Sequence, residues 1–144
     1  MNGLDTIDIQ LNESKNIAVV GLSNKPERAS YGVAKYLQDH GYNIIPVNPA
    51  IETVLGQKSY PDLDSVPISI DLVDIFRQSE AVPPIVDEAI KIGAKFIWMQ
   101  DGVFSEPAKL KAEQAGLLVT MDNCILREHS HRFGDKPSTK PLTT

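Results

Sequence analysis

Cysteine is almost absent from the sequence, since Cys124 is the only one among 144 residues. A single thiol excludes an internal disulfide framework and a zinc site built from several cysteines. The chain also lacks a run of about 20 apolar residues, which a membrane-spanning helix requires. Its first residues, MNGLDTIDIQLNES, are acidic where a signal peptide would be basic and apolar. We therefore expect a cytoplasmic protein with no membrane partner.

Positive charge is also scarce in this chain. Lys and Arg number 14 against 19 Asp and Glu, which gives a formal net charge of -5. This balance disfavours non-specific binding to nucleic acid or to an anionic membrane. An anionic ligand therefore requires that the few cations gather at one place.

The length fits one domain, because domains usually have about 100–200 residues. A chain of 144 residues leaves no room for a separate catalytic domain. We predict a single domain over residues 1–134. Residues 135–144 contain almost no core-forming side chain, and we predict a disordered tail there.

Three segments carry helix start and stop signals, at about residues 30–40, 83–92 and 106–115. Each is followed by a glycine that can end a helix in the left-handed conformation. Apolar residues recur on one face of each segment, and in the third helix we expect Leu110 and Ala115 to face the core.

Five short segments rich in Val and Ile predict strands. Several are apolar at both odd and even positions, which is typical of strands in a parallel sheet covered on both faces. Asp71 and Asp74 interrupt the third strand, and we expect them to point to a sheet end, a partner or water. The five predicted strands are residues 16–20, 43–47, 70–76, 95–99 and 117–120.

The alternation of strands and helices predicts an α/β fold, a Rossmann-like doubly wound parallel sheet of about five strands with helices on both faces. Residues 4–11 fit a helix packed on the sheet, although their alternation also fits a strand. Residues 49–67 are too irregular for a long helix, although residues 51–55 fit one helical turn. Residues 124–133 fit a final helix.

In an open parallel sheet, ligands bind beyond the carboxyl ends of the strands. The loop after the first strand leads into a helix and carries residues suited to phosphate. Gly21 permits a sharp turn, Ser23 and Ser30 offer hydroxyl and N–H groups, and Lys25 and Arg28 add cations.

A dinucleotide fingerprint is not present in this loop, because Ser23 stands where the second glycine of G-x-G-x-x-G belongs. An NAD site also needs an acidic residue at the end of the second strand. That end carries Asn48 and Pro49 instead. The pattern favours a nucleotide with an additional phosphate over NAD.

The third and fourth strands end in residues that can extend the site. Phe76 offers an aromatic face, and Arg77 a cation for a phosphate. Trp98 and Met99, before Gln100, are either a plug in the core or the apolar wall of a slot for a flexible thiol arm. Together with the other loops, they favour the slot.

These motifs together resemble the single-domain bacterial and archaeal CoA-binding protein family, which is related to the CoA-binding domain of the succinyl-CoA synthetase alpha subunit. The resemblance covers residues 14–134, nearly the whole chain. The motifs that carry it are Gly21-Leu22-Ser23 before Lys25-Pro26, Pro46-Val47-Asn48-Pro49, Val73-Asp74-Ile75-Phe76-Arg77, Trp98-Met99-Gln100 and Met121-Asp122-Asn123-Cys124.

The resemblance implies coenzyme A at the carboxyl edge of the sheet. The synthetase's phosphorylated histidine belongs to a further domain, so no catalytic residue carries over. By the resemblance, the phosphates go to Gly21, Ser23, Lys25 and Arg28, the nucleotide borders Asn48 and Pro49, and Phe76, Arg77, Met99 and Gln100 line the remaining slot.

Other reactive side chains favour simpler roles. His129 and His131 lie two apart and would point to different faces of a helix, so we expect no metal site. His40, in the last turn of its helix, fits a surface residue near the helix C-terminus. Cys124 is either a small buried hydrophobe or, at the ligand edge, a thiol that forms a mixed disulfide with CoA under oxidation.

The leading hypothesis is a module that binds CoA or acyl-CoA without catalysis, as a sensor, carrier or regulatory subunit. Two alternatives stay open. One is an NAD(P)-dependent oxidoreductase or nucleotide sensor, and the other is a protein-interaction module with a vestigial pocket. A homodimer is also open, since small α/β domains of this type often dimerise.

Overall fold

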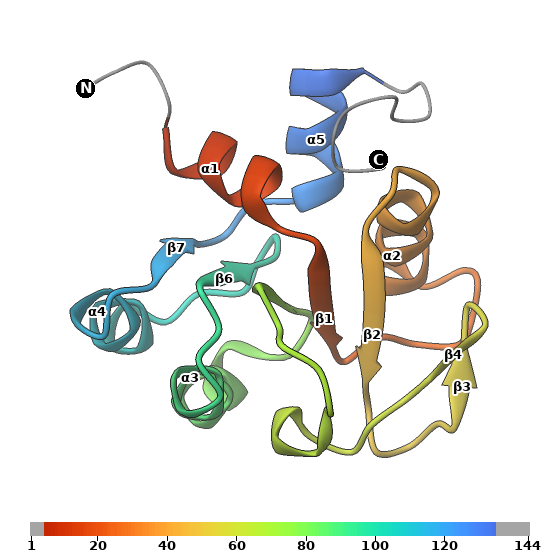
Figure 1. The fold of residues 1–144 in the computed structure, drawn as a ribbon, viewed down its shortest axis with the longest axis horizontal. Helices are drawn as coiled ribbons and strands as arrows, with labels where there is room; N and C mark the ends of the chain where they lie inside the picture. The colour runs from red at the N-terminus through yellow and green to blue at the C-terminus, as the bar shows by residue number, and fades with distance from the viewer. Residues whose placement is uncertain (1–4, 135–144) are drawn as a thin grey trace.

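Five parallel strands form the central layer of the structure, a computed structural model that describes residues 5–134 (Figure 1). Their order across the sheet is β2-β1-β5-β6-β7. This confirms the predicted five-stranded parallel sheet, whereas the predicted tail at residues 135–144 lies outside the described residues. The strands are β1 (Asn16–Val20), β2 (Asn43–Val47), β5 (Leu72–Ile75), β6 (Phe96–Met99) and β7 (Leu118–Thr120).

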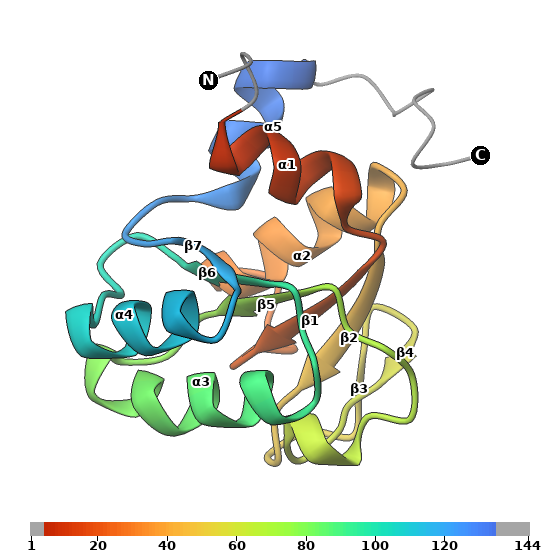
Figure 2. The same ribbon diagram turned by 60° about the vertical axis from the view of Figure 1, so that its left-hand side comes forward.

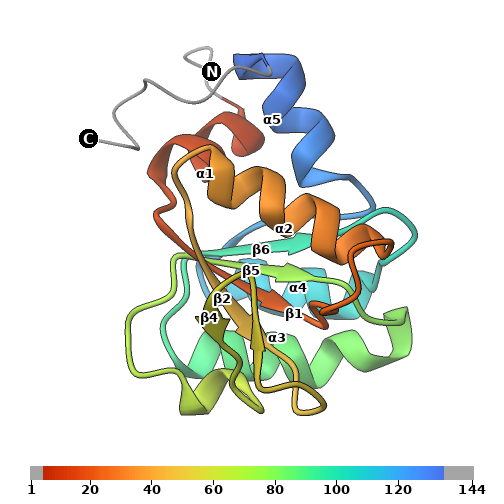
Figure 3. The same ribbon diagram turned by 90° about the vertical axis from the view of Figure 1, so that its right-hand side faces the viewer.

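Helices cover both faces of this sheet, as Figures 2 and 3 show. Strand β1 serves both layers, because Ala18 and Val20 pack towards one and Ile17 and Val19 towards the other. No helix within residues 5–134 has the length and apolar character to span a membrane. One face carries α3 (Val82–Lys91) and α4 (Glu106–Gln114), and the other carries α1 (Thr6–Glu13), α2 (Ala29–Asp39) and α5 (Ile125–Phe133).

The irregular segment after β2 contains a small hairpin, made of β3 (Thr53–Val54) and β4 (Gln57–Lys58). Leu55 and Gly56 form its turn with φ angles of 54° and 75°. Two consecutive positive φ angles are typical of a tight hairpin turn, and they are incompatible with a right-handed helix. The predicted helical turn at residues 51–55 is therefore wrong.

Helix α4 begins as predicted but buries a different face. Ser105 caps it by accepting a hydrogen bond from Ala108 N at 3.3 Å. The side chains that face the sheet are Ala108 and Ala112, whereas Leu110 is 57% exposed and Ala115 is exposed as well. Small residues four apart let the helix approach the sheet closely. The expectation that Leu110 and Ala115 face the core is wrong.

His40 is buried, with only 6% of its surface exposed, so the predicted surface position is wrong. Its ring stacks on Tyr36 at 4.0 Å between centroids and lies 5.2 Å from the ring of His129. His129 belongs to α5, which packs against α2. The cover over His40 therefore comes from a segment about 90 residues away in sequence, which the local pattern around His40 does not reveal.

The two acidic residues of the third strand have different surroundings. Asp71 lies at the sheet end, as predicted, and accepts hydrogen bonds from Lys15 N and Asn16 N at 2.9 Å. Asp74 is fully buried, and neither carboxyl oxygen has a hydrogen-bond partner among the described residues. The expectation that Asp74 reaches a sheet end, a partner or water is wrong.

Helix α1 confirms the helical alternative for the N-terminal segment, and a buried amide joins this helix to the sheet. Gln10 has no exposed surface. Its Nε2 donates to Ile97 O and Leu118 O, both at 3.1 Å, and its Oε1 accepts from Thr120 Oγ1 at 2.6 Å. Three hydrogen bonds thus join α1 to β6 and β7.

Replacing Gln10 with leucine is expected to lower the free energy of unfolding by about 2–4 kcal/mol, because a buried hydroxyl and two carbonyls lose their partner. Urea denaturation with an unchanged m-value measures this loss. Gln114→Leu is the matched control, since Gln114 is exposed on α4. Equal effects of the two variants would show that these hydrogen bonds do not hold α1.

Candidate functional site

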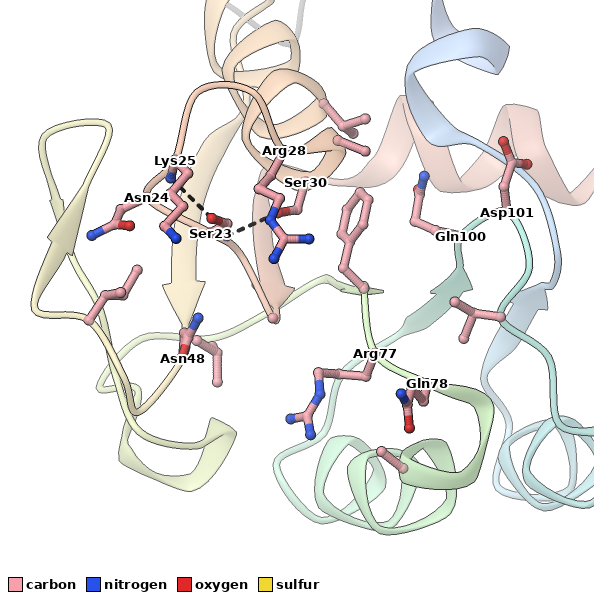
Figure 4. Close-up of a pocket in the computed structure, with 18 of the residues that line it drawn as sticks. Ser23, Asn24, Lys25, Arg28, Ser30, Asn48, Arg77, Gln78, Gln100 and Asp101 are labelled. Carbon is pink, nitrogen blue, oxygen red and sulfur yellow. Dashed lines mark hydrogen bonds between the residues drawn. The ribbon is translucent and has the colours of Figure 1, made fainter.

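A cleft of about 1140 Å³ lies at the carboxyl ends of the strands. It is larger than typical small-molecule pockets, which measure about 300–1,000 Å³. Strand order reverses between β1 and β5, and the loops that follow these two strands both line the cleft. Open α/β sheets bind ligands at such a switch point. The cleft is therefore the candidate site (Figure 4).

The loops after β1 and β5 touch because residue 21 is glycine. Gly21 has a φ of 89°, and its N–H donates to Val47 O at 2.9 Å. A Cβ at this position would lie 2.3 Å from Phe76 O and 2.9 Å from Arg77 Cδ. Any side chain here would push the two loops apart. The close approach of these loops in the cleft therefore depends on glycine at this position.

The loop after β1 is held by hydrogen bonds from its backbone N–H groups to two serine hydroxyls. Ser23 N donates to Ser30 Oγ, and Lys25 N donates to Ser23 Oγ, both at 3.0 Å, as the dashed lines in Figure 4 mark. Helix α2 begins at Ala29, a lining residue, and its N-cap Arg28 makes no side-chain cap. The uncapped N-terminus carries a partial positive charge that attracts anions.

Three cations line the cleft, and none of them forms an ion pair within residues 5–134: Lys25, Arg28 and Arg77. Most other Lys and Arg side chains in this part of the chain do form ion pairs. Figure 4 shows that Arg28 and Arg77 come from different loops and flank the same space. In a chain with a net charge of -5, this arrangement suits a ligand with several negative charges.

The end of β2 contributes shape rather than charge. Asn48 Nδ2 donates to Leu22 O, and Asn48 Oδ1 accepts from Ala50 N, both at 2.9 Å. Its amide therefore braces the loops after β1 and β2 against each other. Pro49 follows and lines the cleft, and no carboxylate from this strand end lies there among the described residues.

Asp101 is the one acid among the described residues that line the cleft. It forms a two-pronged ion pair with Arg127 of α5, with both N–O distances at 2.9 Å. Hydrogen bonds from Arg127 hold the pKa of Asp101 below its usual range. This carboxylate thus stays charged and joins the loop after β6 to α5.

Gln100 lies at the end of the cleft near β6, and Figure 4 shows it on the side away from Lys25 and Asn48. Gln100 is 4% exposed, and its Oε1 accepts from Ile125 N at 3.1 Å. Cys124 is half-buried and lines the same cleft.

Met99 is the one predicted site residue that the structure does not bring to the cleft. Its side chain is fully buried and packs in the core cluster under α3 and α4. Trp98 is also fully buried, and its Nε1 donates to Asn123 O at 2.9 Å. The pair is a core plug, so its interpretation as the wall of a slot is wrong.

All other predicted site residues line the cleft: Gly21, Ser23, Lys25, Arg28, Ser30, Asn48, Pro49, Phe76, Arg77 and Gln100. Sequence reasoning missed several more. Asn24 lies between Ser23 and Lys25, and Gln78 follows Arg77. Their positions in the same loops as predicted site residues are the signal that could have identified them. Ile51 and Val103 reach the cleft from loops without a recognisable pattern.

A family model described as CoA binding domain matches residues 15–130. The chain belongs to this family. The resemblance expected from the sequence motifs is thereby confirmed, together with the Rossmann-like fold of the CoA-binding domain family.

Some proteins similar to this chain are matched over most of their length, and others are much larger and are matched over one region. An uncharacterized protein of Bacillus subtilis, YneT, is 43% identical over 120 residues, which are 83% of this chain and 89% of that protein. The solved structure of a hypothetical protein from Pyrococcus horikoshii is 43% identical, with a TM-score of 0.84 and coverage of 91% and 94% of the two chains.

An ADP-forming acetate–CoA ligase of Methanocaldococcus jannaschii is 30% identical over 99 residues. The match takes in 69% of this chain but only 14% of the ligase. This chain is thus similar to one region of a much larger enzyme.

Proposed function

We propose that this protein binds coenzyme A or an acyl-CoA in the cleft, as a non-catalytic module. The observation that carries the proposal is the group of three unpaired cations, Lys25, Arg28 and Arg77, beside the uncapped start of α2. Coenzyme A carries a pyrophosphate and a ribose phosphate at one end, and a thiol on a flexible arm at the other. A long cleft that is cationic at one end fits this distribution of charge.

The phosphates would take the charged end of the cleft. The start of α2, where the N-cap Arg28 makes no side-chain cap, suits the pyrophosphate. Lys25 and Arg28, beside Asn48 and Pro49, suit the additional phosphate on the ribose. The pantetheine arm would then run past Phe76 towards Gln100, on the side of the cleft away from Lys25.

A binding role without catalysis rests on the side chains that line the cleft. Among the described lining residues there is no histidine, and the one acid, Asp101, is held by Arg127. A general acid or base needs a side chain that is free to exchange its proton with the substrate. The same residues suit a sensor, a carrier or a regulatory subunit.

Isothermal titration with CoA, 3′-dephospho-CoA and NAD tests this proposal. We expect CoA to bind about 10-fold or more tightly than dephospho-CoA, because a phosphate that contacts a cation contributes about 1.5–3 kcal/mol. NAD should bind more weakly than CoA, since no acid at the end of β2 receives its ribose. Tighter binding of NAD would favour the oxidoreductase alternative, and no binding of any ligand would favour a protein-interaction module.

Single substitutions of the cations are expected to weaken CoA binding. Arg28→Ala and Arg77→Ala should each raise the Kd about 10-fold to 100-fold, through the loss of a charge-assisted hydrogen bond. Lys15→Ala is the matched control, because Lys15 is an exposed cation outside the cleft that forms no ion pair within the described residues. Its Kd should stay within about twofold of wild type. Equal losses in all three variants would indicate attraction to overall charge instead of a site.

A further inference from the structure

The end of the cleft near β6 brings together a thiol and an unused hydrogen-bond donor. Cys124 lines the cleft, is half-buried, and is the only cysteine of the chain. It precedes α5 as the N-cap residue and makes no side-chain cap to that helix. Its sulfur is therefore not engaged in capping, and the residue lines the space that a ligand would fill.

Gln100 supplies the second observation at this end. The residue is 4% exposed, and its Oε1 is fixed by the N–H of Ile125, the first residue of α5. Its Nε2 donates to no partner among the described residues. The residue lines the cleft, and Nε2 is not among the buried unpartnered atoms of the described residues, so this donor is open to the cleft. A ligand carbonyl could accept a hydrogen bond from it, and the pantetheine arm of CoA contains two amide carbonyls.

The ligand that fits the charged end of the cleft ends in a sulfur. If phosphates occupy the loop around Ser23 and the arm runs to Gln100, the ligand sulfur and Cys124 share the same end of one cavity. Holding two reacting groups in one site raises their effective concentration by orders of magnitude. Thiol–disulfide exchange needs only a thiolate and a disulfide in contact, without a catalytic base.

We propose that Cys124 is a modification site that captures CoA from CoA disulfide as a mixed disulfide; this inference rests on the proposed function of the cleft. The Cys124 thiol loses its proton to solvent, and the thiolate attacks one sulfur of the bound CoA disulfide. The disulfide bond of the ligand breaks as a bond forms between Cys124 Sγ and one CoA sulfur. The second CoA leaves as a thiolate and takes up a proton, so the number of disulfide bonds is unchanged.

Intact-mass spectrometry without reductant measures this reaction on the full-length protein. With CoA disulfide, we expect a mass increase of one CoA group, reversed by dithiothreitol. Oxidised glutathione is the matched reagent, because it offers a disulfide without a nucleotide. CoA disulfide should react at least about tenfold faster than oxidised glutathione. In Arg77→Ala, and in urea-unfolded protein, that preference should fall towards onefold.

Two results would overturn the inference. Equal rates with the two disulfides would show that Cys124 is merely an accessible thiol, and absence of an adduct would show that it does not meet the ligand. Titration of Cys124→Ser with reduced CoA separates this failure from failure of the proposed function. If the wild-type protein forms no selective adduct but Cys124→Ser binds CoA with wild-type affinity, the disulfide is refuted and the proposed CoA binding stands. No CoA binding by either protein refutes both.

Discussion

Replacing Gly21 with alanine is expected to lower the free energy of unfolding by more than about 3 kcal/mol. Two costs add at this position. A left-handed conformation costs a residue with a Cβ about 1–2 kcal/mol, and Gly21 has a φ of 89°. The new Cβ would also lie 2.3 Å from Phe76 O. A backbone oxygen cannot rotate away, so the loop after β5 has to move.

Two other glycines separate these costs. Gly102 has a φ of 77°, and a Cβ added there would meet no atom within 4 Å. Gly102→Ala should therefore lower the free energy of unfolding by only about 1–2 kcal/mol. Gly32 lies inside α2, where an added Cβ also meets no atom within 4 Å and φ is not positive. Gly32→Ala should raise the free energy of unfolding by about 0.5–1 kcal/mol, because alanine has a higher helix propensity than glycine.

Urea denaturation of the three variants gives the comparison, and CoA titration of Gly21→Ala gives a second readout. Displacement of the loop after β5 moves Arg77, so CoA affinity should fall together with stability. If Gly21→Ala loses no more stability than Gly102→Ala, the contact between the two loops does not depend on glycine.

Much of the fold and of the site follows from local patterns in the sequence. Strands that are apolar at both parities indicate a parallel sheet with two covered faces, and glycine stops place the helices between them. A parallel sheet brings the carboxyl ends of its strands to one edge. Gly21, Asn48 and Arg77 could therefore be assigned to one site although they are far apart in sequence.

The errors have a common physical cause, which is packing between distant segments. Strand β6 is apolar throughout, so its sequence does not indicate which face Met99 occupies. His40 is covered by α5, and the sequence around His40 does not indicate that contact. Leu110 is apolar, which favours a core position, but α4 turns Ala108 and Ala112 to the sheet and leaves Leu110 57% exposed.

Asp74 is the residue for which sequence reasoning erred most, and it also has a large expected effect. It lies on the face of the sheet covered by α1, α2 and α5, because Leu72, two residues earlier on the strand, packs there. Its neighbours across the sheet are Val19 and Trp98. Neither carboxyl oxygen has a partner among the described residues, and burial raises the pKa of Asp74 well above its usual value.

Asp74→Val is therefore expected to raise the free energy of unfolding at neutral pH by about 1–4 kcal/mol. Valine is similar in volume to aspartate, favours strands and has no group to desolvate. Asp71→Val is the matched control on the same segment. Asp71 accepts hydrogen bonds from Lys15 N and Asn16 N, so its replacement should lower the free energy of unfolding by about 1.5–3 kcal/mol.

The pH dependence of the Asp74→Val effect tests the cause. With the pKa of Asp74 raised in the folded state, the folded protein keeps a proton that the unfolded chain loses above its ordinary pKa of 3.8. Wild-type stability should then fall relative to Asp74→Val as pH rises from about 4, by up to about 1.4 kcal/mol per pH unit. The difference should become constant above the folded-state pKa. A difference that does not change with pH would mean that Asp74 titrates normally, and that burial is not what the valine relieves.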